Sequence, residues 1–378
     1  MTTAQADMAV VGGGVIGCAI AWELSKEGHA VVLVERGELA REASWASAGI
    51  ISPPRPNQRA ELAMLGFILH NEIVPELEKR TGISTGSSRR GMIGLSLADD
   101  VAPLREHSAW QQAQGIEAVW LDRDALREKE PAIHERFEGG LFNPGASSVL
   151  LSQVARMFAR AAELEGARIV EHSQVFSIEM DGATATGLHT TKGFVPAGSV
   201  VVASGAWSSM FAENLDYPIA TIPVRGQIMA VAEPPIPLNA AVRHGGYYIY
   251  PRADGTIAIG ATEEHESGFD ARVTPQGLAE LVAVIAELAP TLNQGRLSSY
   301  WAGLRPGTID GESIIGKLPH LENVWIATGH FRSGALLATA TARLLAQTIR
   351  EGKQHPLLAD FDPALRRTQL TAHTPATI

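Results

Sequence analysis

The N-terminal part of the chain alternates apolar runs with one glycine-rich break. Residues 8–11 form a short apolar run that is typical of a buried strand. The segment Gly-Gly-Gly-Val-Ile-Gly follows at 12–17, and apolar positions then recur at helical spacing over 18–27. A second apolar run at 30–34 ends at Glu35. The pattern therefore predicts a strand, a tight turn, a helix and a second strand in succession.

The glycine-rich turn has the spacing of a dinucleotide-binding motif. Gly12 permits the tight turn, Gly14 lets the backbone approach a pyrophosphate, and Gly17 lets the helix pack closely on the strand. The helix N-terminus then offers free N–H groups to the phosphates. Glu35 is placed to accept hydrogen bonds from ribose hydroxyls and would repel a 2′-phosphate, which argues against NADP. The motif alone does not distinguish NAD from FAD.

The rest of the chain separates into helical and strand-like segments. Apolar spacing predicts helices at 60–80, 122–130, 152–166, 275–288 and 335–350. Strand-like runs lie at 91–97, 168–170, 175–180, 200–203, throughout 223–260, and at 324–327, with a hairpin turn at 253–256. Residues 41–49 are small and polar and are expected to form a loop close to a ligand.

These segments predict an α/β protein with a discontinuous architecture. A Rossmann-like dinucleotide-binding domain is expected from residues 1–85, 140–220 and 301–370. An antiparallel, β-rich substrate-binding domain is expected from residues 86–139 and 221–300, interleaved with the first. Residues 371–378 are predicted to be a frayed tail.

Composition and charge exclude several classes of protein. Apolar residues make up 45% and charged residues 19% of the 378 residues, as in globular proteins. The net charge is −10 and no basic block is present, so we expect no nucleic-acid partner. No stretch is long and apolar enough to span a membrane, which predicts a soluble, cytoplasmic protein.

The chain has one cysteine, Cys18, which excludes internal disulfides and multi-cysteine metal sites. Because it follows the glycine turn on the first predicted helix, Cys18 is interpreted as a small core residue. We expect no metal site.

Several motifs beyond the glycine turn carry a family resemblance. They are VVGGGVIG (10–17), SWASAGI (44–50), ASGAW (203–207), PVRGQ (223–227), YYIYPRADG (247–255), WAGLRPGTIDG (301–311) and GHFRSG (329–334). With these motifs the chain resembles the FAD-dependent D-amino acid oxidase superfamily over nearly its whole length. Within that superfamily it resembles the glycine oxidase branch associated with thiamine biosynthesis.

The resemblance implies roles for individual residues. Tyr248 and Arg305 match the family's ligands for the substrate carboxylate, and Arg332 lies on the loop beside flavin and substrate. The backbone of Val175 matches the adenine contact. The expected cofactor-binding residues are Gly12, Gly14, Val15, Ile16, Gly17, Glu35, Arg36, Ser44, Ala48, Gly49, Val175, Ser204, Gly205, Trp207, Gly329, His330, Phe331, Arg332, Ser333 and Gly334.

The chain departs from the family pattern at two places. Residues 332–334 read Arg-Ser-Gly, where the family usually has Arg-Asn-Gly. Gly246 stands two residues before Tyr248, where one subgroup has histidine.

The residues themselves support the same chemistry. A planar carboxylate is held best by a bidentate guanidinium, which Arg305 could supply, although spacing alone equally allows an ordinary ion-pair role. Tyr248 alone could be a core aromatic residue, but strand alternation puts it and Tyr250 on one face and Tyr247 on the other. His244 and His330 are interpreted as structural residues rather than bases.

The predicted reaction is the oxidative deamination of glycine and small amines, including sarcosine and small D-amino acids. Hydride passes to FAD, and O2 accepts the electrons to give H2O2. The FAD is expected to be non-covalent, because Cys18 belongs to a helix and residues 41–50 contain no histidine. The protein is also expected to be a homo-oligomer.

Two alternatives stay open at this level. One is a dehydrogenase of D-amino acids, D-proline or hydroxyproline that uses a quinone or a protein as acceptor. The other is a flavin-binding module without catalysis, or a tRNA-modifying flavoprotein subunit, which the acidic charge balance disfavours.

Overall fold

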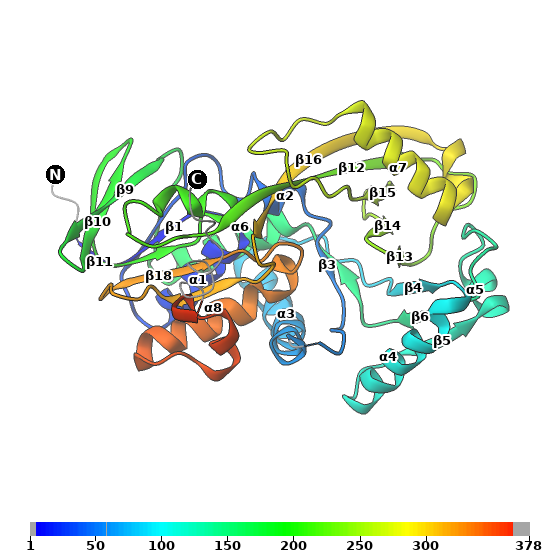
Figure 1. The fold of residues 1–378 in the computed structure, drawn as a ribbon, viewed down its shortest axis with the longest axis horizontal. Helices are drawn as coiled ribbons and strands as arrows, with labels where there is room; N and C mark the ends of the chain where they lie inside the picture. The colour runs from blue at the N-terminus through cyan, green and yellow to red at the C-terminus, as the bar shows by residue number, and fades with distance from the viewer. Residues whose placement is uncertain (1–4, 58, 366–378) are drawn as a thin grey trace, which may run out of the picture.

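Two eight-stranded sheets form the framework of the computed structural model, which describes residues 5–57 and 59–365. Figure 1 shows them as two halves, with the first sheet and its helices on the left and the second sheet on the right. The first sheet has the strand order β17-β18-β11-β1-β2-β8, with β10 paired to β11 and β9 paired to β10. The second has the order β16-β12-β15-β14-β13-β4-β6-β5, and β3 and β7 form a separate pair.

The predicted N-terminal unit lies at the centre of the first sheet. Strand β1 (Ala6–Val11) runs parallel to β2 (Val31–Val34) on one side and to β11 (Gly193–Val202) on the other. All four residues of β2 are buried, as expected of a strand in a covered parallel sheet. Helix α1 (Val15–Lys26) connects β1 and β2. The predicted strand–turn–helix–strand order is thus confirmed.

Helix α1 is buried on most of its surface because helices cover it from several sides. It packs against α6 (Leu151–Leu164) and α8 (Gly334–Glu351). Helix α3 (Ala60–Thr81) in turn packs against both of these helices. Cys18 is fully buried in this core and its Sγ lies 3.4 Å from the carbonyl oxygen of Gly13, which confirms its interpretation as a core residue.

The remaining elements of this half complete the first sheet and its cover. They are α2 (Ala43–Ala46), β3 (Ile50–Ile51), β7 (Ser147–Ser148), β8 (Arg168–Val170), β9 (Val175–Asp181), β10 (Thr184–Thr190), η2 (Gly205–Phe211), β17 (Ile314–Lys317), β18 (Val324–Thr328) and η4 (Pro356–Phe361). Residues 41–49 were expected to be a loop, but α2 forms one helical turn there. The turn closes because no glycine or proline interrupts 43–46 and the N–H groups of Trp45 and Ala46 both donate to the carbonyl of Glu42.

The second sheet is mainly antiparallel and carries its own core. Its strands are β12 (Thr221–Ala232), β13 (Ala241–His244), β14 (Tyr247–Pro251), β15 (Ile257–Gly260), β16 (Arg296–Thr308), β4 (Met92–Ser96), β5 (Val119–Asp122) and β6 (Gly139–Asn143). The helical elements beside them are α4 (Val101–Ala113), α5 (Arg123–Lys129), α7 (Pro275–Leu288), η1 (Ala98–Asp100) and η3 (Pro290–Gln294). One sheet face packs on α7 through Ile249, Ile259 and Leu281, while the other face carries Met92, Ala241 and Tyr250.

The architecture confirms the predicted fold class, an α/β nucleotide-binding layer interleaved with a β-rich antiparallel one. Two of the predicted domain boundaries fall inside strands, since residue 140 belongs to β6 and residue 301 to β16. Both strands belong to the second sheet, so its first chain segment continues to 143 rather than ending at 139, and its second continues to 308 rather than ending at 300. The predicted frayed tail at 371–378 lies outside the described residues.

Neither a helix that could span a membrane nor a cluster of metal-binding side chains occurs among the described residues. No helix in that part of the chain combines the length and the apolar character needed to cross a bilayer. No group of three or more His, Cys, Asp or Glu side chains is arranged to hold a metal ion there.

His70, on α3, makes stability depend on pH. Its side chain is buried, and burial lowers its pKa from an ordinary 6.5 to about 4. Between these values the unfolded chain binds the proton and the folded chain does not, so acidification destabilises the fold. Through His70, the wild type should lose about 2 kcal/mol of its free energy of unfolding between pH 7 and pH 5, and His70→Gln should not show this loss. Urea unfolding at the two pH values measures this, with the partly exposed His29→Gln as control; equal pH sensitivity of His70→Gln and wild type would contradict it.

Candidate functional site

A cavity of about 600 Å³ lies between the two sheets, within the size range of ligand and cofactor sites. Its walls come from both ends of the chain and from the middle. Among the residues predicted from the sequence, those that line it are Gly12, Gly14, Val15, Ile16, Glu35, Arg36, Ser44, Ala48, Gly49, Val175, Ser204, Gly205, Trp207, Tyr248, Arg305, His330, Phe331, Arg332, Ser333 and Gly334. The structure therefore brings both predicted glycine loops and the predicted carboxylate ligands to one space.

Two predicted cofactor residues do not line the cavity, namely Gly17 and Gly329. A Cβ atom on Gly17 would lie 1.9 Å from the carbonyl oxygen of Gly12, so this glycine lets α1 approach the turn. Gly329 has φ +75°, and a Cβ there would lie 2.6 Å from the Thr308 methyl group. Both glycines shape the backbone of the loops instead of facing a ligand.

The N-terminus of α1 opens onto the cavity. Gly14 precedes the helix and supplies no side chain to cap it. The N–H of Val15 donates to Ser44 Oγ at 3.0 Å, which ties the loop at 41–49 to the helix. The other N–H groups of the first turn lack helical partners and, with the helix dipole, favour an anion such as a phosphate. Gly12, at φ +111°, allows the turn that aims them there.

Glu35 stands at the end of β2, as predicted. Its Oε2 accepts a hydrogen bond from the N–H of Gly13 at 2.7 Å, and its Oε1 accepts one from the N–H of Gly37 at 2.9 Å. These bonds fix the carboxylate at the rim of the cavity. Because a carboxylate has about four acceptor sites, two stay available for ribose hydroxyls.

Aromatic and polar side chains form the end of the cavity beyond Glu35. The Arg36 guanidinium stacks on the Trp207 ring at 3.7 Å from its centroid and forms an ion pair with Glu42. Val175 lines the cavity at the start of β9. Ser204 also lines the cavity, and its Oγ is enclosed without a hydrogen-bond partner among the described residues. Such an enclosed polar atom fits a site that a polar cofactor completes.

A second helix N-terminus, that of α8, meets the cavity from the other end of the chain. Ser333 precedes this helix without capping it through its side chain. His330 is buried beside it, donating to or accepting from Thr341 Oγ1 at 3.1 Å. Burial lowers the pKa of His330 to about 4, so the ring is neutral at pH 7 and adds no charge. At this end of the cavity, negative charge is therefore favoured by the dipole of α8 and not by a charged His330.

Arg305 reaches the cavity from β16. Its Nη1 donates to the carbonyl oxygen of Thr262 at 3.0 Å. The guanidinium lies against Gly226, where a Cβ atom would come within 2.3 Å of Arg305 Nη2. Burial lowers the pKa of Arg305, but an arginine stays charged at neutral pH. The site thus presents a half-buried cation with free N–H donors for a carboxylate.

Tyr248 stands beside Arg305 on the same side of the sheet. Its ring packs against Gly260, where a Cβ atom would lie 2.8 Å from the hydroxyl oxygen. Burial raises the pKa of Tyr248, although the guanidiniums of Arg305 and Arg332 act in the opposite direction. The phenol is therefore protonated at neutral pH and can donate its O–H to a carboxylate. Tyr248 and Tyr250 share one face and Tyr247 packs on the other, as alternation predicted.

Arg332 lines the cavity but already has partners. Its Nη1 donates to the carbonyl oxygen of Gly246 at 2.9 Å, and its Nη2 pairs with Glu263 at 2.5 Å. Its charge is therefore largely compensated by the protein. The arrangement suits a positioning role at the cavity rim better than direct binding of a second anion.

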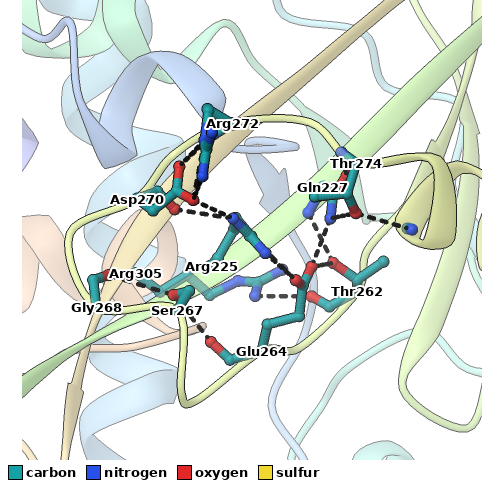
Figure 2. A network of polar contacts seen from close by, with 11 residues as sticks. Arg225, Gln227, Thr262, Glu264, Ser267, Gly268, Asp270, Arg272, Thr274 and Arg305 are labelled. Carbon is teal, nitrogen blue, oxygen red and sulfur yellow. Dashed lines mark hydrogen bonds and ion pairs between the residues drawn. The ribbon is translucent and has the colours of Figure 1, made fainter.

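The carbonyl of Thr262 holds Arg305, and Figure 2 shows the polar network that fixes the segment around Thr262. Arg225 pairs with Glu264 at 2.6 Å and with Asp270 at 3.3 Å. Glu264 also accepts hydrogen bonds from Thr262 Oγ1 and Gln227 Nε2, both at 2.7 Å. Because Thr262 carries the carbonyl that binds Arg305, the network fixes the guanidinium in place.

Among the cavity residues that sequence reasoning missed are two arginines, Arg243 and Arg55. Burial and the neighbouring Arg55 lower the pKa of Arg243 to about 9, which leaves it cationic at neutral pH. A sequence signal for Arg243 existed. Gly245 and Gly246 form a two-residue hairpin turn, and that length sets Arg243 opposite Tyr248. No comparable signal places Arg55. His244, by contrast, packs edge-on against Phe137, as expected of a structural residue.

Comparison with known proteins gives consistent matches. A family model described as FAD dependent oxidoreductase (DAO) matches residues 7–348. The chain is 33% identical over 366 residues to the glycine oxidase of Geobacillus kaustophilus (strain HTA426), covering 95% of this chain and 97% of that protein. The crystal structure of glycine oxidase from Geobacillus kaustophilus matches with a TM-score of 0.86 at 33% identity, covering 95% and 98% of the two chains.

A further solved structure shares the fold at lower identity. The L-proline dehydrogenase from P. horikoshii matches with a TM-score of 0.87 at 22% identity, covering 97% of this chain and 98% of that one. The cavity with its two open helix N-termini, Glu35 in the cavity wall at the end of β2, and the match over most of the chain agree on FAD as the cofactor. The chain belongs to the FAD-dependent oxidoreductase (DAO) family and is a flavoprotein enzyme that oxidises amines or amino acids at the CH–NH2 group.

Proposed function

We propose that this enzyme oxidises glycine, sarcosine and small D-amino acids, with O2 as electron acceptor. The observation that carries the proposal is the pair formed by Arg305 and Tyr248, a guanidinium and a protonated phenol on one wall of the cavity. Together they match the two oxygens of an α-carboxylate. The identity to proteins named glycine oxidase supports the same substrate class.

The protein's contribution to the reaction is orientation. Arg305 and Tyr248 fix the substrate carboxylate, which leaves the amine and the Cα–H group directed into the cavity. Bound FAD would supply the hydride acceptor and pass its electrons to dioxygen. The open N-terminus of α8 stabilises negative charge at its end of the cavity. No side chain has to take a proton from carbon, which agrees with a neutral, buried His330.

The overall reaction converts glycine, O2 and water to glyoxylate, ammonia and H2O2. The test is a peroxide assay with glycine, sarcosine, D-alanine and D-proline, run beside a dye-linked assay under the same conditions. Peroxide formed in step with amine consumption supports the oxidase. Turnover with the dye but not with O2 would instead favour a D-amino acid or D-proline dehydrogenase. If no amine bleaches the flavin anaerobically, the proposed reaction is wrong.

The FAD is proposed to be bound non-covalently. Cys18 is enclosed in the core and does not line the cavity, and no histidine lies in the segment 41–50. We expect acid precipitation to leave all the yellow colour in the supernatant. Colour in the washed pellet would contradict this. A homo-oligomer, a cytoplasmic location and a link to thiamine biosynthesis belong to the same proposal.

A further inference from the structure

Arg243 faces the cavity beside the proposed carboxylate site. It lies opposite Tyr248 in the antiparallel pair β13–β14. Residues opposite one another in such a pair project from the same face of the sheet, with Cα atoms about 4.5–5.5 Å apart. Tyr248 faces the cavity, so Arg243 faces it as well, and both line it. Arg55, from the segment after β3, also lines the cavity, and it is close enough for its charge to act on Arg243.

Neither arginine has an acidic partner in the described part of the chain. No hydrogen bond or ion pair joins Arg243 or Arg55 to another described residue, and Arg243 Nε is enclosed without any acceptor. Two other cavity arginines have acidic partners, Arg332 with Glu263 and Arg36 with Glu42. An enclosed guanidinium without an acceptor is unfavourable unless a ligand supplies one.

The groups around Arg243 add no negative charge. On the neighbouring strand β4 its register partner is Gly94, and a Cβ atom there would lie 3.6 Å from Arg243 Nε. From α4, His107 is close enough for the charge of Arg243 to act on it, and its Nε2 lies 3.3 Å from the carbonyl oxygen of Pro54. Burial and the two arginines lower the pKa of His107, while that carbonyl raises it. The surroundings of Arg243 and Arg55 are therefore positive or neutral.

The charges in the cavity exceed what a monocarboxylate can balance. One α-carboxylate satisfies Arg305 and Tyr248, which leaves the Arg243 and Arg55 guanidiniums uncompensated. The phosphates of a dinucleotide belong at the N-terminus of α1, in the first sheet, whereas Arg243 lies on the second sheet beside Tyr248. A second anionic group on the substrate is the ligand that this arrangement fits.

We propose that Arg243 and Arg55 form a second anion subsite, and that the preferred substrates are amino acids carrying a second carboxylate beyond the one held by Arg305 and Tyr248. This inference rests on the proposed function, because it assumes that Arg305 binds the α-carboxylate. It narrows the proposed substrate class from amino acids with one carboxylate to amino acids with two. The added carboxylate lies either on the nitrogen substituent or on the side chain.

The kinetic test compares substrates that differ by one carboxylate. Iminodiacetate is sarcosine with a carboxylate on its N-methyl group, and D-aspartate is D-alanine with a carboxylate on its side chain. We expect kcat/KM of the wild type to be at least 10-fold higher for iminodiacetate than for sarcosine, or for D-aspartate than for D-alanine. The pair that shows the preference tells whether the second carboxylate belongs on the nitrogen substituent or on the side chain. No preference in either pair would overturn the subsite.

Variants then assign the preference to the two arginines. Arg243→Met should lower the favoured ratio to about 1 and Arg55→Met should lower it by a smaller factor, while Arg243→Lys should restore part of it. The matched control is Arg296→Met, on the same sheet but with a side chain 60% exposed and paired with Glu233 outside the cavity. It should leave the ratio unchanged. An equal loss for dianionic and monoanionic substrates in Arg243→Met would contradict the proposal.

A binding measurement separates the subsite from the reaction. Oxydiacetate and methoxyacetate are ether analogues of iminodiacetate and sarcosine that lack the amine, and their binding is followed by the change in flavin absorbance. Oxydiacetate should bind at least 10-fold more tightly, and Arg243→Met should abolish the difference. If this holds while no amine reduces the flavin, the subsite stands and the proposed oxidation fails. If glycine and sarcosine are oxidised but neither the analogues nor the substrates show a preference for the dianion, the subsite alone fails.

Discussion

Arg305→Leu is expected to lower kcat/KM for glycine by about 10²- to 10⁴-fold, which corresponds to about 3–5 kcal/mol of lost binding. The guanidinium is half-buried and held by the Thr262 carbonyl, and the network around Glu264 fixes that carbonyl. Leucine fills part of the space but offers no donor, so the substrate carboxylate enters the cavity unpaired. The loss should appear mainly in KM, because the guanidinium binds ground state and transition state alike.

Arg296→Leu is the matched control, since Arg296 begins the same strand, β16, and pairs with Glu233 at the surface. It should retain the wild-type kinetics. Flavin content and the melting temperature of both variants show whether each is folded and loaded. A near-normal KM for glycine in a folded, loaded Arg305→Leu enzyme would refute the carboxylate assignment.

Gly14→Ala is expected to weaken FAD binding by about 100-fold or more while the protein still folds. Room exists for the added methyl group, because the nearest atom to a Cβ there is Ser44 Oγ at 3.5 Å. The methyl group would instead occupy the approach to the N-terminus of α1. Losing two charge-assisted hydrogen bonds to a pyrophosphate, each worth about 1.5–3 kcal/mol, accounts for an effect of this size.

The control for this variant is Gly145→Ala, where a Cβ atom would lie 3.7 Å from the Phe67 ring and away from the cavity. Titration of the flavin-free proteins with FAD, followed by flavin fluorescence, gives the two dissociation constants. Circular dichroism of the same samples reports the fold. Wild-type affinity in Gly14→Ala would mean that the pyrophosphate does not lie against this turn.

The local patterns predicted the nucleotide-binding half well because its physics is local. An apolar run, a glycine turn and a helical period together specify β1, α1 and β2, and their order allows one parallel arrangement. The same holds for α7, whose predicted bounds agree with the observed Pro275–Leu288. Its first turn is set by Thr274, whose side chain accepts a hydrogen bond from Gly277.

Other features depend on contacts that no local pattern encodes. Helix α4 was not predicted, and it buries few side chains, His107 and Gln111 among them, so its apolar spacing is weak. The predicted domain boundary at residue 301 falls inside β16, which is one continuous strand whose pairing with β12 extends past that residue. Arg55 reaches the cavity only through the path of the chain after β3. Such placements follow from tertiary packing, which overrides local preference.

The long ladder between β12 and β16 links the two halves of the molecule in Figure 1. Along this ladder Gly303 packs on Ala46 of α2, and the Trp301 indole donates to the Ala46 carbonyl at 3.1 Å. Arg332, in the loop before α8, makes a second link when it donates to the Gly246 carbonyl and pairs with Glu263. A movement that separated the two halves would therefore have to break the contacts of Trp301 and Arg332, whereas the ladder itself would stay intact because both of its strands belong to the second sheet.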